Sequence, residues 1–515
     1  MDLRELFKQM HPPEDEGEAL EGRVIEEIHN VNSGPFHEEQ ILNKQTNLQD
    51  EYIPPETINE GEIFNKVNVH APGSTNLTSI LSSIQESAEE HNSSNVIPTK
   101  ADDFFAPPSG MHDVGLSPIA IQDLLLKFLF YQSSATGKEL ANKIRLPLHS
   151  IVDPMLMQLV DEHYIDITSA NGVGGFNRAY RLSKNGYNRA KDVLKSSSYV
   201  GPAPVSLRDY NKAVEEYYKP LELSEKDLKE AYKDLVISEE VLAQIGPALN
   251  SGKSMFMYGP PGTGKTSVAE RITRCYKSTI KIPYAINVQG IPMRFFDYFL
   301  HKPANFEMQG GALPPLSNEH DNRWVEIQRP CIIVGPEFTI ASADLQYDPE
   351  GSSYQFPNSA KANGGVFVVD DFGRQKENPE ALLNRWIIPL GRNQDILNLR
   401  TGQQISIPFK VFMVFSTNLD PAELVDEAFL RRLAYKMKID YPNLEVYCQI
   451  FANEADKANI KWEDELLDYL IQTHYMKAAR PLRASDPRDL LARVVDYCKF
   501  NKMKTPFTLT KELID

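Results

Sequence analysis

A glycine-rich loop that ends in a lysine and a threonine is the strongest chemical signal in this sequence. It comprises Gly259, Pro260, Pro261, Gly262, Thr263, Gly264, Lys265 and Thr266, with Ser267 directly after it. The short apolar run Ser254-Met-Phe-Met-Tyr258 precedes the loop, and a helical pattern over 267–277 follows it. In such a strand–loop–helix unit, backbone N–H groups turn inward onto phosphates, the lysine reaches the β- and γ-phosphates, and the threonine hydroxyl binds Mg²⁺. The residues from Gly259 to Ser267 are therefore predicted to bind a nucleotide, with Thr266 as a metal ligand.

A pair of adjacent carboxylates follows a second apolar run further along the chain. The run Gly364-Gly-Val-Phe-Val-Val leads directly into Asp370 and Asp371. A buried parallel strand reads as a continuous apolar run, and ligands bind at its carboxyl end. Asp370 would therefore hold Mg²⁺, directly or through water, and Asp371 would polarise the attacking water. Acids that only cap a turn are the alternative, which the spacing from the glycine loop disfavours.

Three further positions carry side chains that could assist hydrolysis. The apolar run that starts at Val411 ends at Asn418, which could orient the same water from a neighbouring strand. Arg431 and Arg432 end a helical segment, and an arginine from the next subunit can stabilise charge on the γ-phosphate in the transition state. Arg488 opens a helix near the end of the chain, where a lid could touch the nucleotide. A lone arginine is more often a surface ion pair, so the interpretation depends on the order of all these elements.

In this order the motifs resemble those of the AAA+ ATPases, over residues 220–515. Within that superfamily the chain is similar to the MoxR-like group. The run Ala362-Asn-Gly-Gly365 precedes the acidic strand, and 395–407 is typical of the group's hairpin insertion, with Thr401-Gly402 at the tip. A second insertion, about 300–360, contains the alternating runs Cys331–Val334 and Phe338–Ile340 and resembles the insert that these ATPases carry in helix 2.

The resemblance implies an α/β P-loop NTPase fold of the AAA+ type, a parallel sheet with a helical C-terminal lid. It implies ATP and Mg²⁺ as cofactors and a homo-oligomeric ring, usually a hexamer, that remodels a protein client. It favours Arg432 over Arg431 as the arginine finger, because Arg432 directly precedes an apolar residue. It also places Ile237, with its neighbours, beside the adenine base, although an apolar helix face explains these residues equally well. Phe295-Phe296 and 309–311 are candidate client-contacting loops, with core packing favoured for the two phenylalanines.

One residue departs from the pattern of the resembled family. The second acid of the carboxylate pair is usually Glu, and here it is Asp371. Its side chain is one methylene shorter, so the carboxylate could stand too far from the water and hydrolysis could be slow. A second hypothesis is therefore an ATP-dependent assembly switch that binds ATP and barely turns over.

Residues 111–195 show the element order of a winged-helix domain. Helical patterns at 119–131, 135–144 and 151–163 precede two strand patterns, 164–168 and 176–182, joined by a glycine-rich turn. A closing helix is predicted over 186–194. Such a domain motivates a third hypothesis, a DNA-associated ATPase.

Charge argues against nucleic acid as the favoured partner of that domain. The candidate recognition helix, 148–163, has no Lys or Arg and contains three acids, whereas the wing carries Arg178, Arg181 and Lys184. Phosphate contacts require cations on the helix that enters the groove. Protein docking is therefore favoured, and salt-dependent binding of duplex DNA by residues 111–195 would favour the DNA hypothesis.

The net charge of −17 is concentrated at the start of the chain. Residues 1–110 hold 21 Asp/Glu and 6 Lys/Arg, a balance of −15, which leaves the other 405 residues near −2. The polar, proline-containing composition of 1–110 predicts an acidic, largely disordered tail. The four cysteines are scattered, without metal-ligand spacing. No apolar run suits a membrane span or a secretory signal, so a cytoplasmic protein is expected.

These patterns predict five parts in order along the chain. They are the acidic tail (1–110), the winged-helix domain (111–195), a surface linker (196–220), the AAA+ ATPase core (221–440) and the helical lid (441–515).

Overall fold

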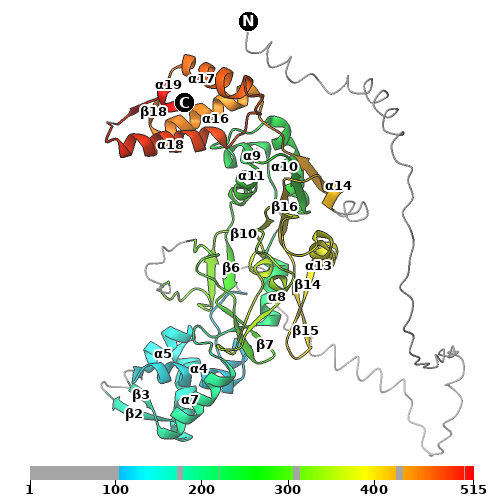
Figure 1. Cartoon of the computed structure of the whole chain (residues 1–515). Helices are drawn as coiled ribbons and strands as arrows, with labels where there is room; N and C mark the ends of the chain where they lie inside the picture. Colours follow the sequence, from blue (N-terminus) through cyan, green and yellow to red (C-terminus); the bar gives the residue numbers. More distant parts are fainter. Residues whose placement is uncertain (1–103, 171–177, 220, 305–313, 425–432, 504) are drawn as a thin grey trace, which may run out of the picture. The chain divides into compact units, whose positions relative to one another are not determined.

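The computed structural model describes residues 104–170, 178–219, 221–304, 314–424, 433–503 and 505–515. The first 103 residues of the predicted tail therefore lie outside the described residues, as do the turn 171–175, the candidate loop 309–311 and both Arg431 and Arg432. All the described residues belong to one compact unit. Figure 1 shows its helices and strands with the labels used below.

A five-stranded parallel sheet carries the glycine-rich loop and the paired carboxylates. Its strands lie in the order β10-β13-β16-β5-β17, and every neighbouring pair is parallel. The bounds are β5 (Met255–Tyr258), β10 (Cys331–Val334), β13 (Val366–Val369), β16 (Phe412–Thr417) and β17 (Tyr435–Lys438). In register, Val369 pairs with Phe415 and Thr417 pairs with Tyr258, so three strands end along one edge. The polar residues that follow these strands are therefore brought together.

Apolar clusters cover both faces of the parallel sheet. Met255 and Met257 of β5 pack with the helices beside the loop, whereas Phe256 packs on the opposite face with Trp386. The first face is covered by α9 (Glu225–Ala231), α10 (Glu239–Ser251), α11 (Lys265–Arg271) and η4 (Ile272–Cys275), and the second by α13 (Pro379–Arg392). Because β-strand side chains alternate between faces, burial on both explains the continuous apolar runs that mark these strands.

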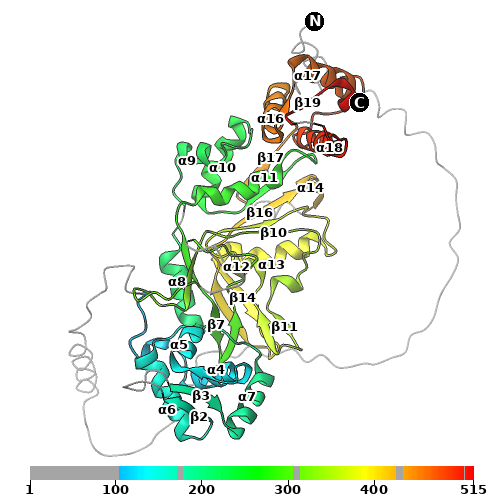
Figure 2. The same cartoon turned by 90° about the vertical axis from the view of Figure 1, so that its left-hand side faces the viewer.

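A second β-module packs around its own core. Its five-stranded sheet has the order β11-β12-β8-β7-β4, beside the antiparallel pairs β6-β9 and β14-β15. Figure 2 shows α8 alongside β7 and β14. The bounds are β4 (Val205–Ser206), α8 (Leu207–Tyr217), β6 (Ile280–Pro283), β7 (Ala285–Val288), β8 (Ile291–Arg294), β9 (Trp324–Ile327), β11 (Gln346–Asp348), β12 (Ser353–Gln355), β14 (Gln394–Asn398) and β15 (Gln404–Pro408). The β14-β15 hairpin confirms the hairpin predicted over 395–407, with Gly402 at its tip.

Three expectations about segment boundaries are wrong. Residues 196–220 are not a surface linker, because β4 pairs with β7 and α8 buries Tyr210 and Val214 completely. The run Cys331–Val334 is not part of an inserted hairpin, because it forms the edge strand β10 of the parallel sheet. The tail does not extend to residue 110, because Phe105 is buried against Trp324 with ring centroids 5.1 Å apart. Short apolar stretches flanked by proline and serine concealed the first and third of these elements.

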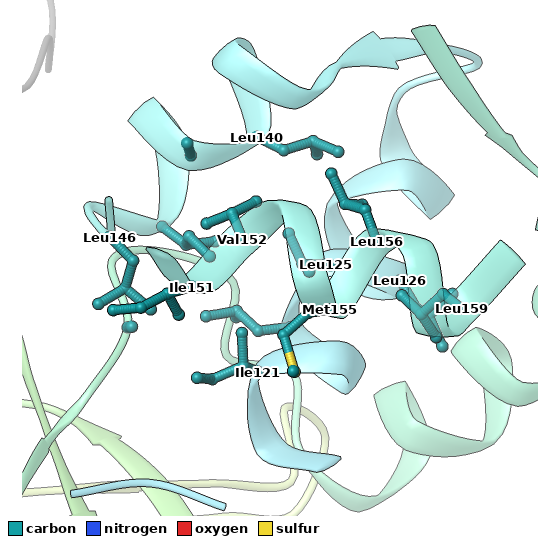
Figure 3. Packing of buried hydrophobic residues seen from close by; sticks show 14 of the residues in the cluster. Ile121, Leu125, Leu126, Leu140, Leu146, Ile151, Val152, Met155, Leu156 and Leu159 are labelled. Carbon is teal, nitrogen blue, oxygen red and sulfur yellow. The ribbon is translucent and has the colours of Figure 1, made fainter. Parts of the chain in front are cut away.

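Residues 111–196 form a helical part with a small antiparallel sheet, order β1-β3-β2. The elements are α3 (Met111–Val114), α4 (Pro118–Tyr131), β1 (Ala135–Thr136), α5 (Gly137–Ile144), η3 (Leu148–Val152), α6 (Asp153–Asp161), β2 (Ile165–Ala170), β3 (Arg178–Leu182) and α7 (Lys184–Ser196). Thr136 starts α5 with a reciprocal capping box to Glu139, as its Thr-x-x-Glu spacing dictates. Figure 3 shows Leu125, Leu140 and Leu156 packing into one core.

The C-terminal part is mostly helical. Its elements are α16 (Leu444–Ala458), β18 (Ile460–Lys461), α17 (Asp464–Leu470), η6 (Ile471–Met476), α18 (Asp486–Phe500), β19 (Phe507–Thr508) and α19 (Lys511–Ile514). The short helices elsewhere in the described residues are η5 (Ala341–Ala343), α12 (Asn358–Lys361) and α14 (Pro421–Leu424). Buried Tyr447 and Tyr475 share a hydrogen bond of 2.9 Å, and Tyr475 donates to Asp486 at the start of α18. This chain of hydroxyls ties the core of the C-terminal part to the first residue of α18.

Candidate nucleotide-binding site

The glycine-rich loop turns sharply out of β5 because two of its glycines adopt conformations that other residues rarely take. Gly259 has a φ of 140°, and a Cβ there would lie 2.2 Å from the carbonyl oxygen of Ile439. Gly262 has a φ of 79°, and a Cβ there would lie 2.8 Å from the Ser485 hydroxyl. Both positions therefore require glycine, the first because of a close backbone approach and the second because of its left-handed turn.

Lys265 opens α11 and is almost completely buried, with 6% of its surface exposed. Its Nζ donates to the carbonyl oxygens of Gly259 at 3.0 Å and Pro260 at 2.8 Å, and to Oδ1 of Asn418 at 2.7 Å. Burial lowers the pKa of Lys265, and the charges of Asp370 and Asp371 oppose that shift. The ammonium is thus held inside the loop, where phosphate oxygens would find it.

The first of the paired carboxylates, Asp370, contacts the end of the glycine-rich loop. Thr266 donates from its hydroxyl to Oδ2 of Asp370 at 2.7 Å. Neighbouring oxygens of an octahedral Mg²⁺ shell, with metal–oxygen distances of about 2.0–2.1 Å, lie about 3 Å apart. A hydroxyl and a carboxylate at this separation therefore fit two adjacent positions around the ion, and Mg²⁺ would supply charge stabilisation for the phosphates there.

Asp371 and Asn418 form the second half of the site. Nδ2 of Asn418 donates to Oδ1 of Asp371 at 3.0 Å, while its Oδ1 accepts from Lys265. Asp371 has a φ of 48°, a left-handed conformation that Asp tolerates better than most side chains. Phe372 N–H donates to the carbonyl of Ser416 at 2.7 Å, which fixes this turn against β16. One amide side chain thus links the loop lysine with the second carboxylate.

The segment before α18 contacts the loop, a feature that the sequence did not reveal. Ser485 N–H donates to the Gly262 carbonyl at 3.0 Å, and the Arg483 side chain packs beside Gly262. Arg483 Nε is buried and has no hydrogen-bond partner among the described residues. Arg488, the predicted lid arginine, is exposed and paired with Asp489 at 3.2 Å. Arg483 stands five residues from the predicted position, and no local signal separates the two.

Some of the remaining predicted residues lie in apolar cores, and the others lie outside the described residues. Ile237 is partly buried and packs with the cluster that covers α11, which accords with an apolar core role. Phe295 and Phe296 are 1% and 2% exposed, so core packing is confirmed for them. Arg431 and Arg432 lie outside the described residues. The structure therefore brings together Lys265, Thr266, Asp370, Asp371 and Asn418, the residue types that phosphate and Mg²⁺ binding require.

The parallel sheet, together with a glycine-rich loop of the phosphate-binding type, defines a P-loop nucleotide-binding fold. Residues 443–515 match a protein family described as "Domain of unknown function (DUF8689)". None of the curated proteins compared with the chain is similar to it in sequence.

The similar solved structures are distant. They include RuvB from Thermotoga maritima, a Holliday junction branch migration motor, with 14% identity over 56% of this chain and 71% of RuvB, and a TM-score of 0.31. They also include NtrX from Brucella abortus, with 12% identity over 64% of this chain and 62% of NtrX, and a TM-score of 0.32. Structural similarity at these identities and TM-scores supports no conclusion about function. None of the helices in the described ranges is long and apolar enough to cross a membrane.

Proposed function

We propose that the chain is an AAA+ ATPase of the MoxR-like type, which binds and hydrolyses ATP in a homo-oligomeric ring and remodels a protein client. The observation that carries the proposal is the pair of hydrogen-bonded connections Lys265–Asn418–Asp371 and Thr266–Asp370. They join residues from three neighbouring strand ends, in the arrangement that phosphoryl transfer to water requires.

Each residue has a defined task in this proposal. Lys265 exchanges its carbonyl partners for phosphate oxygens, because a charge-assisted bond to phosphate is stronger than a bond to a neutral carbonyl. Thr266 and Asp370 hold Mg²⁺, and Asp371 accepts a proton from the attacking water, which Asn418 orients. The ring would supply Arg432, or its neighbour Arg431, from the next subunit, and Arg488 would reach the nucleotide only after movement of the lid.

The test is ATP turnover measured against protein concentration, with the mass of the assembly measured in parallel. Turnover that rises as assemblies form supports a shared site, and Arg432→Ala should abolish it while ATP still binds. Lys436→Ala, which removes an exposed lysine from β17, is a matched control. Negligible turnover at every concentration, in a protein that binds ATP, would refute the motor.

A slow ATP-dependent switch is the second candidate, and one observation favours it. Asp371 lies in a left-handed conformation and is already bonded to Asn418, so its carboxylate has limited freedom to reach a water. A switch would assemble on ATP and disassemble after exchange of the nucleotide. Assembly induced by ATP in the Asp371→Asn variant, with the same mass as wild type, would be expected of a switch and of a motor alike. Turnover of the wild type therefore decides between them.

We propose that residues 111–195 form a winged-helix domain that docks on protein. Two cations of the domain are paired within it: Arg181 of the wing lies 3.6 Å from Asp166, and Arg189 of α7 pairs with Asp123 at 2.9 Å. Cations that are already paired release few counterions on meeting phosphate, so they contribute little to DNA affinity. A salt-dependent shift of duplex DNA by the full chain, lost on Arg178→Ala and Arg181→Ala, would support the DNA-associated alternative instead.

A further inference from the structure

A cavity of about 500 Å³ lies where the helical part meets the second β-module. Its walls come from the end of α4, the end of α5, the loop Tyr199–Pro202 and the chain around β7 and β8. The two sides are firmly joined, because Ala203 N–H donates to the Ile144 carbonyl at 2.7 Å and Ala285 belongs to the core of the helical part. The cavity is therefore a feature of one packed body, away from the glycine-rich loop.

Three cations line this cavity, and none of its lining residues is acidic. They are Lys143, Arg145 and Arg294, and none forms an ion pair with a described acidic residue. Lys143 and Arg294 are exposed, whereas Arg145 has only 6% of its surface exposed. Three like charges around one space repel one another, so a ligand that carries negative charge would relieve the repulsion.

Arg145 brings a buried guanidinium group with incomplete hydrogen bonding to the wall of this cavity. One of its guanidinium nitrogens, Nη2, donates to the Pro314 carbonyl at 2.5 Å, but Nε is buried with no hydrogen-bond partner among the described residues. A buried charged donor without a partner is costly, and such groups are generally satisfied by water, an ion or a ligand. The residue is also held in a left-handed conformation, with a φ of 61°, at the end of α5.

Two tyrosines add neutral donors to the same space. Burial raises the pKa of Tyr284 to about 12, so its hydroxyl stays protonated near neutral pH. The hydroxyls of Tyr284 and Tyr298 make no hydrogen bond to another described residue, whereas Tyr199 donates to the Pro202 carbonyl at 2.7 Å. The cavity thus offers side-chain donors that lack acceptors, a combination that suits an oxyanion with several oxygens.

Phe128 and Phe296 lie beside the tyrosines in the wall, which also contains Asn142 and residues 200–202. Faces of aromatic rings bind planar rings by stacking, and guanidinium groups bind phosphate oxygens in a bidentate manner. Ligand sites for small molecules occupy about 300–1,000 Å³, so the volume is adequate for one phosphate and one ring system.

We propose that this cavity binds a mononucleotide-class small molecule, through a phosphate monoester on Arg145, Arg294 and Lys143 and a planar ring on the aromatic wall. The ligand would connect the helical part with the second β-module. This site is separate from the glycine-rich loop and does not depend on the proposed ATPase activity.

The test is calorimetric titration of AMP into the full-length Lys265→Ala protein, which lacks the lysine of the glycine-rich loop. We expect one saturable site for AMP and much weaker binding of adenosine and of inorganic phosphate. Arg294→Gln and Lys143→Gln should each weaken AMP about tenfold, through loss of a charge-assisted bond. Both side chains are exposed, so neither substitution threatens folding, as Arg145→Gln would.

Lys138→Gln is the matched control, because Lys138 is exposed on the same helix and does not line the cavity. It should leave AMP affinity unchanged. Absence of saturable AMP binding at millimolar concentration would overturn the proposal. So would binding that Arg294→Gln and Lys143→Gln leave intact, or adenosine binding as tightly as AMP, because the cations would then have no part in it.

Discussion

Ser485, in the C-terminal part of the chain, donates its backbone N–H to the carbonyl oxygen of Gly262 in the glycine-rich loop at 3.0 Å. The Arg483 side chain packs on the same glycine. The conformation of the loop and the position of the C-terminal part are therefore coupled by a main-chain bond, which does not depend on side-chain identity at 485.

We expect Arg483→Ala to weaken ATP binding more than Arg488→Ala does. Arg483 is the arginine whose side chain packs against the loop, and its buried Nε has no hydrogen-bond partner among the described residues. Loss of one charge-assisted contact should cost about 1.5–3 kcal/mol, roughly 10- to 100-fold in affinity. Fluorescent-nucleotide titration of both variants measures the difference. A larger loss for Arg488→Ala would mean that the C-terminal part rotates when nucleotide binds.

Lys265→Ala should reduce ATP affinity by about 10- to 100-fold, because it removes the only buried ammonium of the described loop residues. It should leave the melting temperature nearly unchanged or raise it, since a buried cation is removed together with its desolvation cost. Equilibrium binding and a thermal melt of the same samples check both statements. Lys253→Ala, at an exposed lysine before β5, is the control. Unaltered ATP affinity in Lys265→Ala would place the nucleotide elsewhere.

Asp371→Glu should lower turnover rather than raise it. The left-handed backbone at this position favours Asp over Glu, at a cost of the order of 1 kcal/mol, and the longer side chain would displace the bond from Asn418. Single-turnover hydrolysis with saturating ATP isolates this effect from binding. Asp371→Asn provides the comparison, because it keeps the conformation and removes the base. A turnover gain in Asp371→Glu would instead show that the wild-type carboxylate is too short.

His301 should make the protein less stable in mild acid. Its Nδ1 accepts from the Asp297 N–H and its Nε2 donates to the Lys361 carbonyl, so the neutral ring fits, and burial lowers its pKa to about 4. As the pH falls below about 6.5, His301 takes up a proton in the unfolded chain but stays neutral in the folded chain. The free energy of unfolding therefore falls towards pH 4. The loss between pH 7 and pH 5 should be about 2 kcal/mol.

Denaturant unfolding at these two pH values measures the loss. His301→Gln should flatten the pH dependence, although it lowers stability at neutral pH. His112→Gln, at a largely exposed histidine, should retain the wild-type dependence. Equal slopes in wild type and His301→Gln would assign the acid sensitivity to other groups.

The parts of the site that could be predicted from the sequence are those that local backbone geometry determines. The glycine spacing before Lys265 dictates a phosphate-binding turn, and apolar runs that end in Asp370 and Asn418 indicate neighbouring buried strands. Arg483 escaped prediction because its approach to Gly262 depends on how a distant helical part folds back. A long-range contact of this kind produces no periodic pattern in the sequence.

Two other predictions were wrong because the local sequence suits more than one structure. Cys331–Val334 is an apolar run of four residues, and such a run suits an edge strand and an inserted hairpin equally well. Helix α8 carries Tyr210 and Val214 on its buried face, yet the proline- and serine-containing residues before it favoured a linker. Only the tertiary partner decides these cases, which is strand β13 of the parallel sheet for Cys331–Val334 and the core of the second β-module for α8.

Phe104 and Phe105 pack on Tyr217 and Trp324, and Asp321 N–H donates to the Phe105 carbonyl at 2.6 Å. Phe105 shares one apolar cluster with Val205 of β4 and Ala213 of α8, so residues 104 and 105 belong to the packing of the second β-module. Removal of these two phenylalanines would therefore uncover Trp324 and Tyr217, and the folded module begins at least as early as residue 104.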